Sequence, residues 1–155
     1  MMKTALIAVA AGLLTVTAGC SGIDQKKLEP VYRSAKAVEA GATAGVSYMQ
    51  FRELLQPLQT ELAIARDRVS NEAERGLVAD YGKAADLYQD SAALWALKIE
   101  HGPFLSDDGA ATALATKHGL RRTEIGTIDA DAGIRSIWAQ AAVWTGAGTA
   151  VYTGH

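Results

Sequence analysis

The sequence predicts an all-α protein, in which a long antiparallel helical hairpin plus two shorter helices form a small bundle. Apolar residues recur at spacings of three and four through most of 30–101, as they do on one face of an amphipathic helix. The same stretch is rich in Ala, Leu, Glu, Gln and Arg, which favour helices. Only a short connection near residue 70 interrupts it, and so short a connection makes two helices antiparallel neighbours. The 155 residues are enough for one domain.

The N-terminal segment has the organisation of a secretory signal peptide. Lys3 is followed by an uncharged apolar run that ends in small residues, and this run is shorter than the roughly 20 residues a membrane-spanning helix needs. The residues Thr17-Ala18-Gly19-Cys20 resemble the lipobox of bacterial lipoproteins, with Thr17 where the typical box has Leu. This resemblance covers residues 1–20 alone.

The resemblance implies cleavage between Gly19 and Cys20 and attachment of a diacylglycerol to the Cys20 thiol. Cys20 is the only cysteine of the chain, so an internal disulfide is excluded. Several acyl chains on one residue bind a membrane far more stably than the marginal binding of one chain. Ser21, where an aspartate would signal inner-membrane retention, favours the outer membrane. We therefore expect a lipid-anchored protein of the bacterial cell envelope, at the outer membrane and facing the periplasm.

The body of the chain is expected to begin after a flexible tether over residues 20–29. Pro30 suits the first position of a helix, where its missing N–H is not needed, and the apolar pattern continues to about Val69. A proline inside a helix costs about 3 kcal/mol. Pro57 therefore predicts a kink or break around 54–57.

The second long helix has clear signals at both ends. Asn71 followed by Glu74 resembles a capping box. His101 lies in the last turn, and Gly102 and Pro103 then stop the helix.

The C-terminal third predicts two shorter helices. The first covers 110–118, and residues 119–130 are interpreted as a loop. The last helix is expected to start after Asp129 or Asp131 and to end at Gly146 and Gly148. The bundle domain is thus expected over 30–145, with a flexible tail over 146–155.

The composition argues against nucleic acid as a partner. The formal net charge is −2, without a long basic run, whereas phosphate binding requires concentrated positive charge. The stretch ALATKHGLRRTEIGTI has the spacing of a DNA-binding helix-turn-helix, but Gly126 and the β-branched Thr127 and Ile128 disfavour its second helix. We expect no nucleic-acid binding.

The sequence offers no candidate catalytic residues and no candidate metal ligands. It lacks a G-x-S-x-G motif and a Walker loop. The stretch IDADAG has its glycine one position early for an EF-hand loop, and Asp129 and Asp131 fit a helix start better. His101, His118 and His155 are scattered along the chain, without carboxylate partners at ligand spacing. We expect no cofactor, no metal and no enzymatic activity.

Six aromatic residues are candidates for a partner surface or for a pocket between helices. These are Tyr48, Tyr81, Tyr88, Trp95, Trp138 and Trp144. The segment 132–154 carries Arg135 as its only charge, so its helix either completes the core or offers an aromatic surface to a partner or lipid.

Two functions remain open on these grounds. The first is a non-enzymatic interaction or scaffold module with an unidentified envelope protein as partner. The alternative is a periplasmic module that binds a small molecule or an ion. A binding module predicts a closed apolar cavity with a few convergent polar groups, whereas a scaffold predicts a filled core.

Overall fold

A computed structural model describes residues 22–106 and 109–155. The signal peptide, the cleavage site and Cys20 lie outside the described residues. The helices are α1 (Gln25–Ala44), α2 (Tyr48–Arg68), α3 (Glu72–His101), α4 (Gly109–His118) and α5 (Ala130–Thr153), and the strands are β1 (Phe104–Leu105) and β2 (Ile128–Asp129). The predicted all-α bundle is confirmed.

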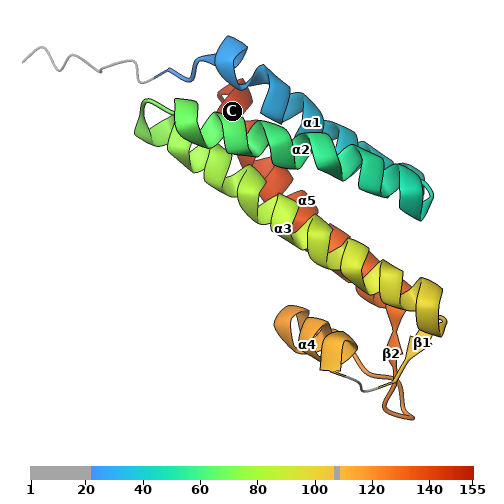
Figure 1. Ribbon diagram of the computed structural model, residues 1–155. Helices are drawn as coiled ribbons and strands as arrows, with labels where there is room; N and C mark the ends of the chain where they lie inside the picture. The colour runs from blue at the N-terminus through green and yellow to red at the C-terminus, as the bar shows by residue number, and fades with distance from the viewer. Residues whose placement is uncertain (1–21, 107–108) are drawn as a thin grey trace, which may run out of the picture.

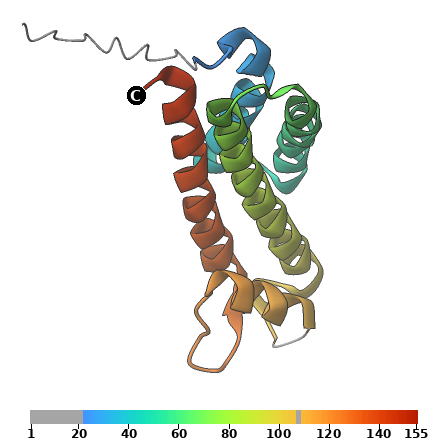
Figure 2. The same ribbon diagram turned by 90° about the vertical axis from the view of Figure 1, so that its left-hand side faces the viewer.

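The four longest helices alternate in direction, and two of them extend beyond the others. Helices α3 and α5 run side by side, and α1 and α2 form a layer against one end of this pair (Figure 1). Helix α4 and the two strands lie at the opposite end, as the turned view in Figure 2 also shows. The C-terminus lies beside the start of α1, so both ends of the described chain are at the same end of the bundle.

The predicted long first helix is two helices, which are separated at residues 45–47. Helix α2 is unbroken over 54–57, where the sequence predicts a kink or break. Gly45, with φ +78°, ends α1, and Ser47 and Gln50 form a capping box that starts α2. Pro57 lies inside α2. The helix tolerates it because large apolar side chains are buried both before and after it, and each of these contributes roughly 1.5–3 kcal/mol. These are Phe51, Leu55, Leu58 and Leu62.

The start of α1 also differs from the prediction. Residues 25–29, expected in the tether, are helical, and Pro30 lies inside α1 rather than at its first position. Two features explain the earlier start. The Asp24 side chain caps the helix by accepting a hydrogen bond from the Lys27 N–H at 3.0 Å, and Leu28 is fully buried.

Both predicted ends of α3 are confirmed. The Asn71 side chain accepts a hydrogen bond from the Glu74 N–H at 2.9 Å, and Gly102, with φ +92°, ends the helix. The capping box is incomplete, however, because the Glu74 carboxylate is bonded to the Ser70 N–H instead of that of Asn71.

The C-terminal region contains three differences from the prediction. Helix α4 begins one residue earlier, at Gly109. The expected loop contains β2, which pairs with β1 in antiparallel register. Helix α5 starts after Asp129, as predicted, but it continues past Gly146 and Gly148 to Thr153. Gly148 keeps the helix close to the rest of the bundle, because a Cβ there would lie only 2.8–3.0 Å from ring atoms of Tyr81.

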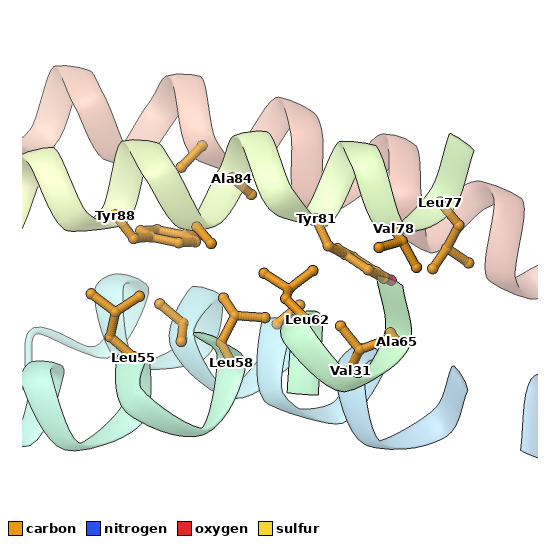
Figure 3. Close-up of a cluster of buried hydrophobic side chains, with 14 of the residues drawn as sticks. Val31, Leu55, Leu58, Leu62, Ala65, Leu77, Val78, Tyr81, Ala84 and Tyr88 are labelled. Atoms are coloured by element: carbon orange, nitrogen blue, oxygen red, sulfur yellow. The ribbon is translucent and has the colours of Figure 1, made fainter. Parts of the chain in front are cut away.

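The core is filled mainly by α1, α2, α3 and α5. Figure 3 shows Tyr81 and Tyr88 pointing from α3 toward leucines of α2. A second cluster, around Leu94, Leu105 and Ile128, holds α4 and the strands against the far end of α3 and α5. Within the part of the chain that the structure describes, no helix combines the length and the apolar character needed to cross a membrane.

Candidate functional site

Four of the six predicted aromatic residues gather around Phe51. The Phe51 ring centroid is 5.3 Å from that of Trp138 and 6.0 Å from those of Trp95 and Tyr88. Trp95 contacts Trp138 edge to face at 5.7 Å, and Tyr48 lies 5.7 Å from Trp95. Ring pairs at these separations contribute about 0.5–1.5 kcal/mol each beyond their buried area. The cluster therefore joins α2, α3 and α5 through packing.

The polar atoms near this cluster bond to one another. The indole N–H of Trp138 donates to the Ser91 hydroxyl at 2.9 Å, and that hydroxyl donates to the Tyr88 carbonyl at 2.7 Å. Among the described residues, every buried side-chain nitrogen and oxygen has a hydrogen-bond partner. No polar group in this region is left to orient a buried ligand.

Tyr81 and Trp144 lie apart from the Phe51 cluster. Tyr81 is fully buried, and its hydroxyl is 3.4 Å from that of Thr149 on α5. The Trp144 ring is half-buried and has the Lys83 ammonium 3.8 Å from its centroid, a cation–π contact between α5 and α3. Both residues fasten α5 to α3.

The two buried tyrosines are poor candidates for acid–base chemistry. Burial disfavours the charged phenolate and raises the pKa of Tyr81 to about 12, although the hydrogen bond with Thr149 acts in the opposite sense. Burial likewise raises the pKa of Tyr88. Both side chains stay protonated at neutral pH.

A hollow lies on the surface between α2 and α3. This α2–α3 groove has a volume of about 780 Å³ and is open to solvent along one side. It is lined by Tyr48, Met49, Arg52, Glu53, Leu55, Gln56, Gln59, Gln89, Ala92, Ala93 and Ala96. Of the six predicted aromatic residues, Tyr48 alone lines it.

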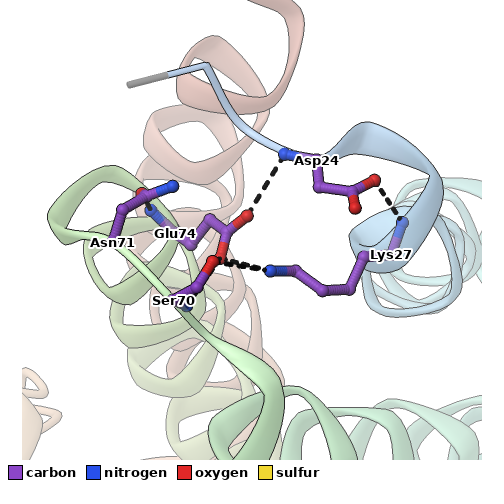
Figure 4. Close-up of polar contacts among 5 residues, drawn as sticks. All are labelled: Asp24, Lys27, Ser70, Asn71 and Glu74. Carbon is purple, nitrogen blue, oxygen red and sulfur yellow. Dashed lines mark hydrogen bonds and ion pairs between the residues drawn. The ribbon is translucent and has the colours of Figure 1, made fainter. Parts of the chain in front are cut away.

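A polar cluster around the buried Glu74 carboxylate connects the start of α1 to the start of α3 (Figure 4). The Glu74 carboxylate is 2.6 Å from the Lys27 ammonium. It also accepts hydrogen bonds from the Ser70 N–H and hydroxyl, at 2.8 and 2.9 Å, and from the Asp24 N–H at 3.2 Å. Burial alone would raise the pKa of Glu74, but Lys27 and the Ser70 and Asp24 donors outweigh it and lower the pKa to about 2.

His118 has a carboxylate partner that lies 28 residues away in the sequence and that sequence spacing did not indicate. Its Nε2 lies 2.8 Å from Oδ2 of Asp90, and the same oxygen is 2.7 Å from the Lys117 ammonium. The His118 side chain is only 4% exposed, so this contact holds the end of α4 against α3. In the described residues, three or more potential ligands do not come together as a metal site.

No family model matches the chain, and neither a curated protein nor a solved structure shows significant similarity to it.

Sequence reasoning missed Phe51 and most of the groove. Phe51 belongs to the apolar stripe of 48–69, and only the fold reveals that three other aromatic rings meet it. The groove lining begins at Tyr48, the first residue of α2, so its position follows from where α2 starts. The capping box at Ser47 and Gln50 is the signal that would have located the start of α2.

Proposed function

We propose that this chain is a lipid-anchored protein of the bacterial cell envelope that acts as a non-enzymatic interaction or scaffold module. It is anchored at the outer membrane through Cys20, faces the periplasm, and has another envelope protein as its partner. The observation that carries the module's role is the filled aromatic core. Phe51, Tyr88, Trp95 and Trp138 pack against one another, and their polar neighbours are all bonded. A small-molecule site would instead require a closed cavity with free polar groups.

The anchor is supported by residues 17–20, and the fold adds an orientation to it. Three residues separate Cys20 from Asp24, where α1 is capped. They span at most about 14 Å, so the bundle is held close to the bilayer. The 30 residues of α3 extend about 45 Å away from this end. The end that carries α4 and the strands is thus the distal end.

The anchor is tested with the full chain expressed in bacteria. Cys20→Ser should accumulate as uncut precursor and should not incorporate labelled fatty acid, whereas the wild type is cut and labelled. Normal cleavage and labelling of the variant would refute the anchor.

The interaction role is tested by chemical cross-linking of the wild-type chain in intact cells. We expect a discrete adduct with another envelope protein. A thermal-shift screen of the full chain against metals and metabolites tests the alternative function. A reproducible ligand-dependent rise in melting temperature, without any cross-linked partner, would favour the binding module and refute the scaffold.

A further inference from the structure

We propose that the α2–α3 groove binds an amphipathic helix of the partner protein, about three turns long. This inference deepens the proposed interaction role and rests on it. It starts from the apolar stripe of α3, which continues beyond the helices that cover it.

Three residues of α3 lie on one line along the helix. Ala92 is 11 residues after Tyr81, close to three turns, and Ile99 is 18 residues after Tyr81, which makes five turns. Tyr81 is fully buried and Ala92 is 6% exposed, but Ile99 is 62% exposed. The same face of α3 that is covered by helices near Tyr81 is therefore uncovered at Ile99.

The opposite wall of the groove ends in a second exposed apolar side chain. Met49, in the first turn of α2, is 64% exposed and lines the groove. Methionine is flexible and polarizable, and it is common at surfaces that bind helices. Met49 thus adds a large exposed apolar side chain to the groove, and Ile99 lies on α3 three residues beyond Ala96, the last α3 residue of its lining.

The dimensions and lining of the groove suit a helix. Its α2 wall extends from Tyr48 to Gln59, about 17 Å or three helical turns. Its α3 wall consists of Gln89 and the small residues Ala92, Ala93 and Ala96, and these alanines allow another backbone to approach closely. An amphipathic helix laid in such a groove uses apolar residues spaced by three and four.

The charges of the groove indicate which helix would fit. The lining contains one cation and one anion, the neighbours Arg52 and Glu53, and its other polar side chains are those of Tyr48 and three glutamines. A helix with an apolar ridge and uncharged flanks is complementary to this lining, whereas a strongly charged helix would leave its charges uncompensated.

The partner is expected to be a different protein rather than a second copy. Each helix that the structure describes already packs its main apolar face within its own bundle, and its exposed apolar residues, such as Met49, Ile99 and Val143, are few on each helix. A second copy therefore has no spare amphipathic helix to place in the groove.

The test is photo-cross-linking of the full chain in its native cells. Benzoylphenylalanine replaces Ala93, which is exposed and lines the groove, or Ala79, which is exposed on the same helix outside the groove. We expect a discrete protein adduct from position 93 that is about tenfold stronger than any from position 79. The adduct's sequence, read by mass spectrometry, should contain apolar residues at spacings of three and four. An adduct with lipid, glycan, a second copy or an extended segment would overturn the proposal.

A second pair of variants tests the groove with the photoreactive residue at Gln89. Ala93→Arg should reduce the amount of adduct about tenfold, whereas Ala79→Arg should leave it unchanged. Equal effects of the two substitutions would overturn the groove proposal. The results also distinguish failure of the groove proposal from failure of the proposed interaction role. With the photoreactive residue at the exposed Ile125, adducts there but not at position 93 would overturn the groove proposal and leave the interaction role intact. The absence of adducts from all these positions would overturn both the groove proposal and the interaction role.

Discussion

Lys27 and Glu74 are 47 residues apart in the chain, and their side chains form a 2.6 Å ion pair at the end of the bundle where α1 and α3 begin. The Glu74 side chain is 1% exposed and that of Lys27 is 20% exposed. The pair connects the first turn of α1 to the first turn of α3. The first residues of the body are therefore part of the cooperative fold.

Removing the cation of this pair should destabilise the bundle strongly. Lys27→Met leaves a buried carboxylate without its counter-charge, which costs about 3 kcal/mol. Lys26→Met is the matched control, because Lys26 is the exposed neighbour, and it should change the free energy of unfolding by less than about 0.5 kcal/mol. Urea denaturation measures both, and equal effects of the two substitutions would contradict the role of the ion pair.

The low pKa of Glu74 predicts a specific loss of stability in acid. The carboxyl group has an ordinary pKa of 4.5 and a pKa of about 2 in the folded chain. Between these values the unfolded chain binds the proton and the folded chain does not, so the free energy of unfolding decreases as the pH falls. The contribution is fully present above about pH 4.5 and is lost progressively towards pH 2. Glu74→Gln should flatten the pH dependence in this window, and parallel curves for the variant and the wild type would refute the assignment.

Gly148 and Gly146 provide a matched test of how α5 packs. A Cβ at residue 148 would lie 2.8–3.0 Å from the Tyr81 ring, whereas at residue 146 it would meet open space. Gly148→Ala should destabilise the protein by about 1–3 kcal/mol through overpacking. Gly146→Ala should stabilise it by up to about 1 kcal/mol, because alanine favours the helix. Thermal unfolding of the two variants should therefore shift in opposite directions, and a shift in the same direction would contradict this packing.

Replacing Pro57 should stabilise the folded protein. The proline removes one backbone hydrogen bond inside α2, and its side chain is exposed. Pro57→Ala restores the bond at the cost of a more flexible unfolded chain, for a net gain of about 2 kcal/mol. The exposed control Gln59→Ala should change the free energy of unfolding by less than about 0.5 kcal/mol. A destabilised Pro57→Ala variant would mean that α2 requires the proline.

Pro57 also illustrates which parts of the fold follow from local sequence. The ends of α3 were predictable because Asn71 and Gly102 act through backbone atoms within one turn. The position of the break between α1 and α2 was not, because the local penalty at Pro57 is outweighed by tertiary burial of α2 side chains. The better local signal was Gly45 followed by the Ser47 cap.

The candidate sites depend even more on contacts between distant residues. Apolar spacing places Tyr88 and Trp95 on one face of α3, but it does not indicate that Phe51 and Trp138 meet them. Glu74 has the spacing of a capping residue in the sequence, and its partner Lys27 comes from another helix. The α2–α3 groove similarly requires residues 48–59 of α2 to lie beside residues 89–96 of α3, which the spacing within either helix does not indicate.

Tyr32 and Tyr152 test whether the last turns of α5 belong to the folded bundle. Their rings stack at 4.1 Å with an interplanar angle of 9°, and the Gln25 amide donates to the Tyr152 carbonyl at 2.8 Å. Tyr32→Ala and Tyr152→Ala should each destabilise the protein. Their double variant should be about 1 kcal/mol more stable than the sum of the single effects predicts, because the stacked pair is lost only once. The neighbouring control Val151→Ala should add independently to Tyr32→Ala. Hydrogen exchange at the end of α5 should become faster in Tyr152→Ala, and strict additivity with unchanged exchange would show that the C-terminal residues contribute nothing to the bundle.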